Sequence, residues 1–301
     1  MKKSIIFTVL IASMLTACGT NTTVKPIETT ARVETQSTES ITTSTQSEVN
    51  QNTVSEVLAE VEQQDIFNQD GIKVTVEGFD QDYHGPYLNV LVENNTDKNI
   101  IVQTRNSSLN GFMIEFLFSC NVAPGKKAND RIEIDHRALD LSGIGKICDI
   151  DFDLVILDEN FSTIAKNNNI HIDRNLNEPY TQTYDDSGTL VYDQNNIRII
   201  WKDFGSDDTY SALLLYIENN SDEEIAVQAR DTSVNGFMVD PFISSHILPG
   251  KKVVCTMSFY NKDLKSNGIT DINEIETRFN ITTSSFTKTI AKTDLIKITL
   301  N

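Results

Sequence analysis

The side chains most often used in catalysis are scattered along this chain of 301 residues. None of the four histidines stands at the spacing of a metal-ligating motif: His84, His136, His171 and His246. Nucleophilic catalysis needs a nucleophile held beside a base and an orienting group, and no nucleophile-elbow motif surrounds any serine. We therefore expect a protein that is not an enzyme, with no catalytic residue, no metal site and no cofactor.

Three carboxylates alternate with apolar residues in one short segment. Asp149, Asp151 and Asp153 would share one face of a strand. Oxygen ligands of this kind could hold a cation. Simple exposure to solvent produces the same alternation, and Arg278 stands 125 residues after Asp153, where a carboxylate would be needed again. We expect a solvated strand face.

Two Gln–Arg pairs are the candidate binding residues. Each pair has one residue between its members, and the pairs lie 125 residues apart: Gln103, Arg105, Gln228 and Arg230. The guanidinium group can bind a carboxylate or a planar ligand group through two parallel hydrogen bonds. An internal ion pair with Glu93 or Glu218 is the alternative, since such surface pairs are common.

The first 18 residues have the polarity of an export signal. Lys2 and Lys3 precede an apolar stretch from residue 5 to residue 15, which is shorter than the about 20 residues needed to span a bilayer. The sequence Leu-Thr-Ala-Cys, which ends at Cys18, resembles the lipobox of bacterial lipoproteins. The resemblance implies that residues 1–17 are removed. It also implies that Cys18 carries a lipid, which anchors the chain to the extracellular face of the cell membrane.

Composition limits the partners of the chain. The formal net charge of −18 argues against nucleic acid, because phosphate binding needs clustered Lys and Arg. Besides Cys18 the chain has Cys120, Cys148 and Cys255, an odd number that cannot all pair. Cys120 and Cys148 could form a bridge, but we favour buried free thiols.

Residues 18–64 form a predicted stalk. The segment is rich in Thr and Ser and poor in aromatic residues. A stretch of this composition cannot bury enough apolar surface to offset the entropy of ordering it, so we expect disorder.

The remaining chain matches itself when it is shifted by 125 residues. Between positions 93 and 113, 13 of the 21 residues are identical to those at 218–238. The shared segments are Glu-Asn-Asn-Thr/Ser-Asp, Asn-Gly-Phe-Met and Pro-Gly-Lys-Lys. This similarity indicates a duplicated domain, and the period is long enough for each copy to have its own core.

Each copy has the pattern of a β-sandwich. Residues 72–76 alternate between apolar and polar types, and Asn-Gly and Pro-Gly are typical of tight turns. We expect an all-β chain with two tandem immunoglobulin-like antiparallel β-sandwich domains. The first would cover residues 65–174 and the second 190–301, with a linker at 175–189.

The order of strand, Glu-Asn-Asn, strand, Asn-Gly-Phe-Met and Pro-Gly-Lys-Lys resembles an uncharacterised domain of Gram-positive lipoproteins. It is similar, more distantly, to telokin-like and immunoglobulin-like lipoprotein domains. The resemblance covers residues 65–301 and implies a fold, with no catalytic or ligand residues.

These features together predict a non-enzymatic surface protein. We expect two immunoglobulin-like modules, tethered to the membrane through Cys18, that bind a protein or glycan partner. The alternative is an accessory lipoprotein that associates with another component of the membrane or cell envelope.

Overall fold

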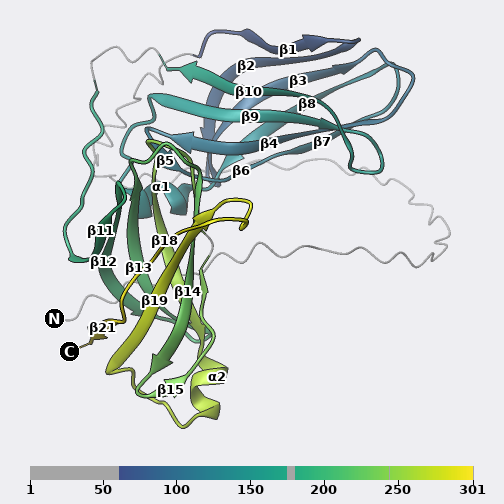
Figure 1. The fold of residues 1–301 in the computed structure, drawn as a ribbon. Helices are drawn as coiled ribbons and strands as arrows, with labels where there is room; N and C mark the ends of the chain where they lie inside the picture. The colour runs from purple at the N-terminus through teal and green to yellow at the C-terminus, as the bar shows by residue number, and fades with distance from the viewer. Residues whose placement is uncertain (1–60, 175–179, 244, 301) are drawn as a thin grey trace, which may run out of the picture. The chain divides into compact units, whose positions relative to one another are not determined.

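The computed structural model describes residues 61–174, 180–243 and 245–300. The predicted signal peptide, Cys18 and the stalk as far as residue 60 lie outside these residues. Most of the described residues belong to strands, and antiparallel sheets pack face to face as sandwiches (Figure 1). The all-β prediction is therefore confirmed.

The N-terminal sandwich consists of two sheets. In spatial order the first contains β1 (Gln64–Gln69), β2 (Ile72–Asp82), β3 (Gly85–Asn94), β8 (Lys126–Ile134) and β6 (Phe116–Leu117). The second contains β10 (Thr163–Asp173), β9 (Asp149–Leu157) and β4 (Ile100–Leu109), and β4 also pairs with β5 (Phe112–Met113) and β7 (Ser119–Val122).

The C-terminal sandwich has the same strand order. Its first sheet contains β11 (Thr189–Gln194), β12 (Ile197–Ser206), β13 (Tyr210–Asn219), β18 (Lys252–Tyr260) and β16 (Phe242–Ile243). Its second contains β15 (Phe237–Met238), β14 (Ile225–Val234), β19 (Glu274–Thr283) and β20 (Thr289–Lys292), with β17 (His246–Ile247) on β14 and β21 (Ile296–Thr299) on β19. A parallel bridge between Lys252 and Phe112 connects β18 with β5.

Each sandwich encloses its own hydrophobic cluster. Alternate residues of the strands point inward, as Val74, Val92 and Leu154 do in the first cluster. Burying a side chain of this size contributes about 1.5–3 kcal/mol to stability. The second cluster is built in the same way, for example from Leu215 and Phe279. Two residues of the C-terminal sandwich, Ile200 and Tyr216, join the first cluster.

Two short helices complete the elements, α1 (His136–Ser142) and α2 (Asn261–Ser266). The side chain of Asp135 accepts a hydrogen bond from the backbone N–H of Arg137 and so caps the start of α1. Gly143, with φ +66°, ends the helix in the left-handed conformation that glycine adopts readily.

The Asn-Gly pairs form the predicted hairpin turns. Asn110 and Gly111 have φ values of +48° and +83°, and Asn235 and Gly236 have +48° and +83°. Two consecutive positive φ values define a type I′ turn, whose twist matches that of the flanking strands. The turns therefore fix the register of β4 with β5 and of β14 with β15.

A buried asparagine anchors the polar turn of each sandwich. The Asn94 side-chain amide donates to the carbonyl oxygens of Lys98 and Val122, and its oxygen accepts from the N–H and hydroxyl of Thr96. Asn219 makes the equivalent bonds in the C-terminal sandwich. Both asparagines are fully buried, so this network replaces the water that their polar atoms lose on folding.

The structure differs from the sequence expectations at the boundaries of the sandwiches. Strand β1 begins one residue before the predicted start of the first domain, and Val61, from the predicted stalk, packs in the core. We did not predict β1 or β11, because both segments are short and partly polar. The last part of the second sandwich is divided into β20 and β21 at Thr293, whose N–H donates to the Phe279 carbonyl oxygen and whose hydroxyl accepts from the Phe279 N–H.

The first described residues of the predicted linker, 180–184, are packed against the N-terminal sandwich. Gln182 is buried and accepts a hydrogen bond from the Asn110 side chain at 3.0 Å. The Tyr184 hydroxyl donates to the Asn110 carbonyl oxygen at 3.0 Å, and the Tyr184 ring contacts that of Phe112. Residues 180–184 therefore extend the fold of the first sandwich.

Candidate functional site

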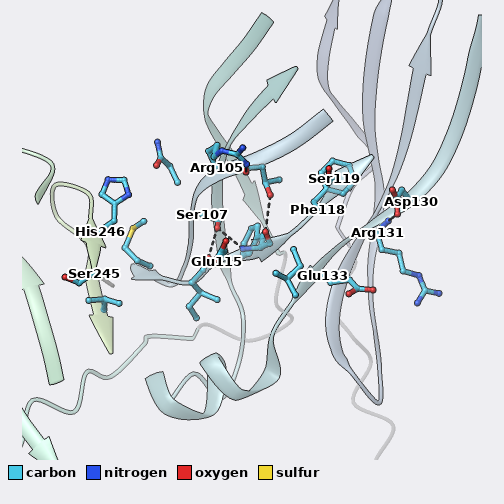
Figure 2. Close-up of a pocket in the computed structure, with 17 residues that line it drawn as sticks. Arg105, Ser107, Glu115, Phe118, Ser119, Asp130, Arg131, Glu133, Ser245 and His246 are labelled. Carbon is cyan, nitrogen blue, oxygen red and sulfur yellow. Dashed lines mark hydrogen bonds between the residues drawn. The ribbon is translucent and has the colours of Figure 1, made fainter. Parts of the chain in front are cut away.

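One pocket lies beside β4 and β8 of the N-terminal sandwich, with Ser245, His246 and Val253 of the C-terminal sandwich also in its lining, and we call it the β4–β8 pocket (Figure 2). Its volume is about 890 Å³. Several charged and polar side chains line it: Arg105, Glu115, Ser119, Arg131, Glu133 and His246. The pocket is thus polar and carries both signs of charge.

The segment between β5 and β7 forms one wall of this pocket. It leaves β4, pairs with β8 through β6, and returns to β4 through β7. Ser107 holds it in place, since its hydroxyl donates to the Ile114 carbonyl oxygen at 2.6 Å and accepts from the Phe116 N–H at 3.0 Å. The wall is therefore a fixed part of the sandwich.

The structure places one of the predicted binding residues of the first sandwich, Arg105, at the edge of this pocket. Arg105 is exposed and lines the pocket, and its guanidinium group donates to the Gln103 side-chain oxygen and to the Thr104 carbonyl oxygen. Gln103 in turn donates to the Ser119 hydroxyl at 3.0 Å. Gln103 therefore positions Arg105, while part of the guanidinium surface faces solvent.

The Gln–Arg pair of the second sandwich has the same geometry. Arg230 donates to the Gln228 side-chain oxygen and to the Ala229 carbonyl oxygen at 2.9 Å, and Arg230 is exposed. The alternative partners of the arginines, Glu93 and Glu218, are engaged elsewhere: Glu93 pairs with Lys127, and Glu218 accepts from the Tyr216 hydroxyl. The arginines are thus held by glutamine.

A β-bulge follows each of these arginines. The register of β4 with β9 shifts between Arg105 and Ser108, and Asn106 has a φ of +54°. The register of β14 with β19 shifts between Arg230 and Ser233, and Asp231 has a φ of +50°. Bulges redirect the side chains beside them, so both arginines are presented at equivalent bends.

The second arginine of the β4–β8 pocket, Arg131, has partners of its own. Arg131 forms an ion pair with Asp82 at 3.0 Å and stacks over the Tyr87 ring at 4.1 Å. Burial raises the pKa of the neighbouring Cys120 to about 12, and the Asp130 carboxylate adds to the shift. The Cys120 thiol therefore stays protonated at neutral pH, which makes it a poor nucleophile.

The acidic strand face of β9 is more engaged than the sequence indicated. Asp153 accepts from the Asn106 side chain and the Asn169 N–H, each at 2.7 Å. Asp151 bonds to the His171 ring and to Lys251, each at 2.6 Å. Burial raises the pKa of Asp151, but the bonds from Lys251 and His171 outweigh it and lower the pKa overall.

His171 was not predicted as a functional residue, yet it lies beside three carboxyl groups, two of β9 and one of β10. Its ring nitrogens contact Asp151 at 2.6 Å and Asp173 at 3.0 Å, and Asp149 is also within reach. The hydrogen bond to Asp151 raises the pKa of His171. The sequence pattern His-x-Asp indicates that His171 and Asp173 share one face of a strand. Only the pairing of β10 with β9 shows that this face lies beside Asp149.

No helix in the described residues is long and apolar enough to cross a membrane.

Comparisons with known proteins leave the family of this chain open. No protein-family model matches the chain, and no curated protein matches it. Among solved structures, the chain is similar to a protein of unknown function from Porphyromonas gingivalis W83. The alignment has 12% sequence identity and a TM-score of 0.20, and it covers 74% of this chain and 95% of the other.

Proposed function

We propose that the chain is a non-enzymatic, lipid-anchored surface protein that presents two immunoglobulin-like modules to a protein or glycan partner. The lipobox-like sequence at Cys18 supports the anchor, and the Thr/Ser-rich stretch after it supports a stalk. The self-match at 125 residues supports duplication of one module.

The observation that carries the binding role is the pair of equivalent exposed arginines. Arg105 and Arg230 are each held by a glutamine two residues before them, and each precedes a bulge. Holding a long side chain in one conformation costs conformational entropy, and a surface arginine without a ligand would be more favourable if it stayed mobile. A fixed arginine at the same place in both sandwiches is therefore best explained as a ready-made contact for a ligand.

The β4–β8 pocket favours a polar ligand. Its charged side chains are of both signs, so a ligand that carries one strong charge would gain little net attraction there. Hydroxyl and amide groups of a glycan or an extended peptide could bond to Ser119, Glu115 and Glu133, while Phe118 offers an apolar surface.

Two modules on one tether would also increase avidity. If each sandwich binds the same repeated ligand, the second contact forms at the effective concentration set by the first. Moderate affinity at each arginine is then sufficient for firm attachment to a surface that carries many copies of the ligand.

The test is an array experiment with the Cys18→Ser chain, which keeps every described residue. We expect binding to a defined set of glycans or envelope proteins, with a loss of about tenfold or more for Arg105→Ala combined with Arg230→Ala. Lys127→Ala, which removes an exposed partner of Glu93, is the matched control.

Absence of any binding on both arrays, together with co-purification of one stoichiometric membrane protein, would instead support the accessory role. Binding that is unaffected by the two arginine changes would contradict the proposed site.

A further inference from the structure

Three potential metal-ligating side chains converge on the exposed face of β9 and β10. One ligand atom from each of Asp149, His171 and Asp173 lies within 4.8 Å of the others. The pairing of the two strands brings them together, since Asp149 stands opposite Asp173 and Asp151 opposite His171. The start of β9 is fixed, because the Asn110 side-chain oxygen accepts from the N–H groups of Cys148 and Asp149.

Asp149 and Asp173 form a cross-strand pair of like charges. Two like charges directly opposite each other destabilise a sheet. Among the described residues, neither carboxylate forms an ion pair with a lysine or arginine, and the His171 ring contacts Asp173 through Nε2 at 3.0 Å. The two negative charges therefore favour a cation between the strands.

The His171 ring is oriented as in a metal site. Its Nδ1 faces the Asp151 carboxylate at 2.6 Å, which leaves Nε2 directed towards Asp173. A carboxylate on the far nitrogen is the usual support of a metal-bound histidine. Lys251 and Ser108 hold the other Asp151 oxygen at 2.6 and 3.2 Å, so Asp151 is already neutralised and serves to position the ring.

In the C-terminal sandwich, a lysine ammonium group occupies the position that corresponds to His171. There Glu276 stands opposite Lys297, and Glu274 stands opposite Thr299. The Lys297 ammonium group lies 2.6 Å from Glu274 and 3.7 Å from Glu276. In the N-terminal sandwich the lysine is replaced by His171 and the threonine by a further carboxylate, Asp173. These differences remove a fixed positive charge and add two ligands.

We propose that Asp149, His171 and Asp173 form a binding site for one divalent transition-metal ion of the Zn²⁺ class. An imidazole nitrogen beside two carboxylates favours Zn²⁺ over Ca²⁺ or Mg²⁺, which prefer sites made entirely of oxygen. Three protein ligands leave a coordination position for water or for a group from a partner. The ion would neutralise the Asp149–Asp173 pair as Lys297 neutralises the two glutamates.

The test is a calorimetric titration of the purified, chelator-treated full chain with Zn²⁺ alone, and a parallel titration with Co²⁺ followed by visible absorption. We expect one Zn²⁺ per chain at this site and a Co²⁺ spectrum typical of mixed nitrogen and oxygen ligands. His171→Lys and Asp173→Thr copy the residues of the C-terminal sandwich, and each should weaken Zn²⁺ binding at least about tenfold.

Both substitutions are at exposed positions, so thermal unfolding should show a folded protein in each case. His136→Gln, which changes another exposed histidine of the same sandwich, should bind Zn²⁺ like the original chain. Failure to bind Zn²⁺, or Zn²⁺ binding of equal strength in the folded His171→Lys variant, would overturn the proposal.

Discussion

The Asn94 side chain reaches across the first sandwich to the carbonyl oxygen of Val122, 2.9 Å away, although 28 residues separate the two in the chain. Asn219 makes the same contact with Ile247 at the same distance and separation. This contact attaches the polar turn after β3 to the end of β7, and the turn after β13 to β17. The turn segment that is shared at an offset of 125 residues therefore has the same structural role in both sandwiches.

Replacing Asn94 by alanine should destabilise the chain by about 2–3 kcal/mol, because buried carbonyl and N–H groups would lose their partners. Urea unfolding followed by far-ultraviolet circular dichroism measures the change in the free energy of unfolding. Asn95→Ala, at the adjacent exposed position, should change it by less than about 0.5 kcal/mol. Equal effects of the two changes would refute the role of the buried amide.

The thiols should react slowly in the folded chain. Burial raises the pKa of both Cys120 and Cys255 to about 12, and it raises that of Cys148 as well. We expect iodoacetamide at pH 8 to modify Cys120 and Cys255 much faster in denaturant than in the native protein, as measured by mass spectrometry. Rapid native modification of Cys120, which is buried in the first core, would be inconsistent with the structure.

Acid should weaken the contact between Asp185 and Lys202. Hydrogen bonds from Ser187 and from the Lys202 ammonium group, the latter at 2.9 Å, hold the pKa of Asp185 well below its ordinary value of 3.8. A lowered folded-state pKa stabilises the fold above the ordinary value, and this contribution is lost as the pH falls through 3.8 towards the lowered pKa.

Asp185→Asn should therefore reduce the stability at pH 7 but narrow the difference in urea midpoint between pH 7 and pH 3. Asp193→Asn, at an exposed carboxylate of β11, is a suitable comparison. The same acid sensitivity in the original chain and in Asp185→Asn would rule out this contribution.

The sequence predicted those parts of the fold that depend on local chemistry. Asn110-Gly111 determines a hairpin because few residue pairs tolerate two positive φ values. Strand β1 could not be predicted in this way, because it is stabilised by pairing with β2 and its own residues show no clear strand pattern.

The candidate sites, too, were predictable only where they depend on local sequence. The spacing of Gln103 and Arg105 was visible in the sequence, but the hydrogen bond between them and the wall formed by β6 depend on packing. The proximity of His171 to Asp149 depends on the register of β10 with β9, which shifts between Asn167 and Ile170. A bulge of this kind cannot be located from alternation alone, so the cluster could not be predicted.

Metabolic labelling with an alkyne fatty acid tests most directly the claim that this chain is a lipid-anchored surface protein. We predict that the full chain, expressed in a bacterium that processes lipoproteins, becomes labelled and is found in the membrane fraction. In a host with a single membrane, antibody should also bind it on intact cells. Cys18→Ala should abolish the label and release the protein from the membrane fraction. An unlabelled protein that remains inside the cell, or labelling that persists in Cys18→Ala, would contradict the account.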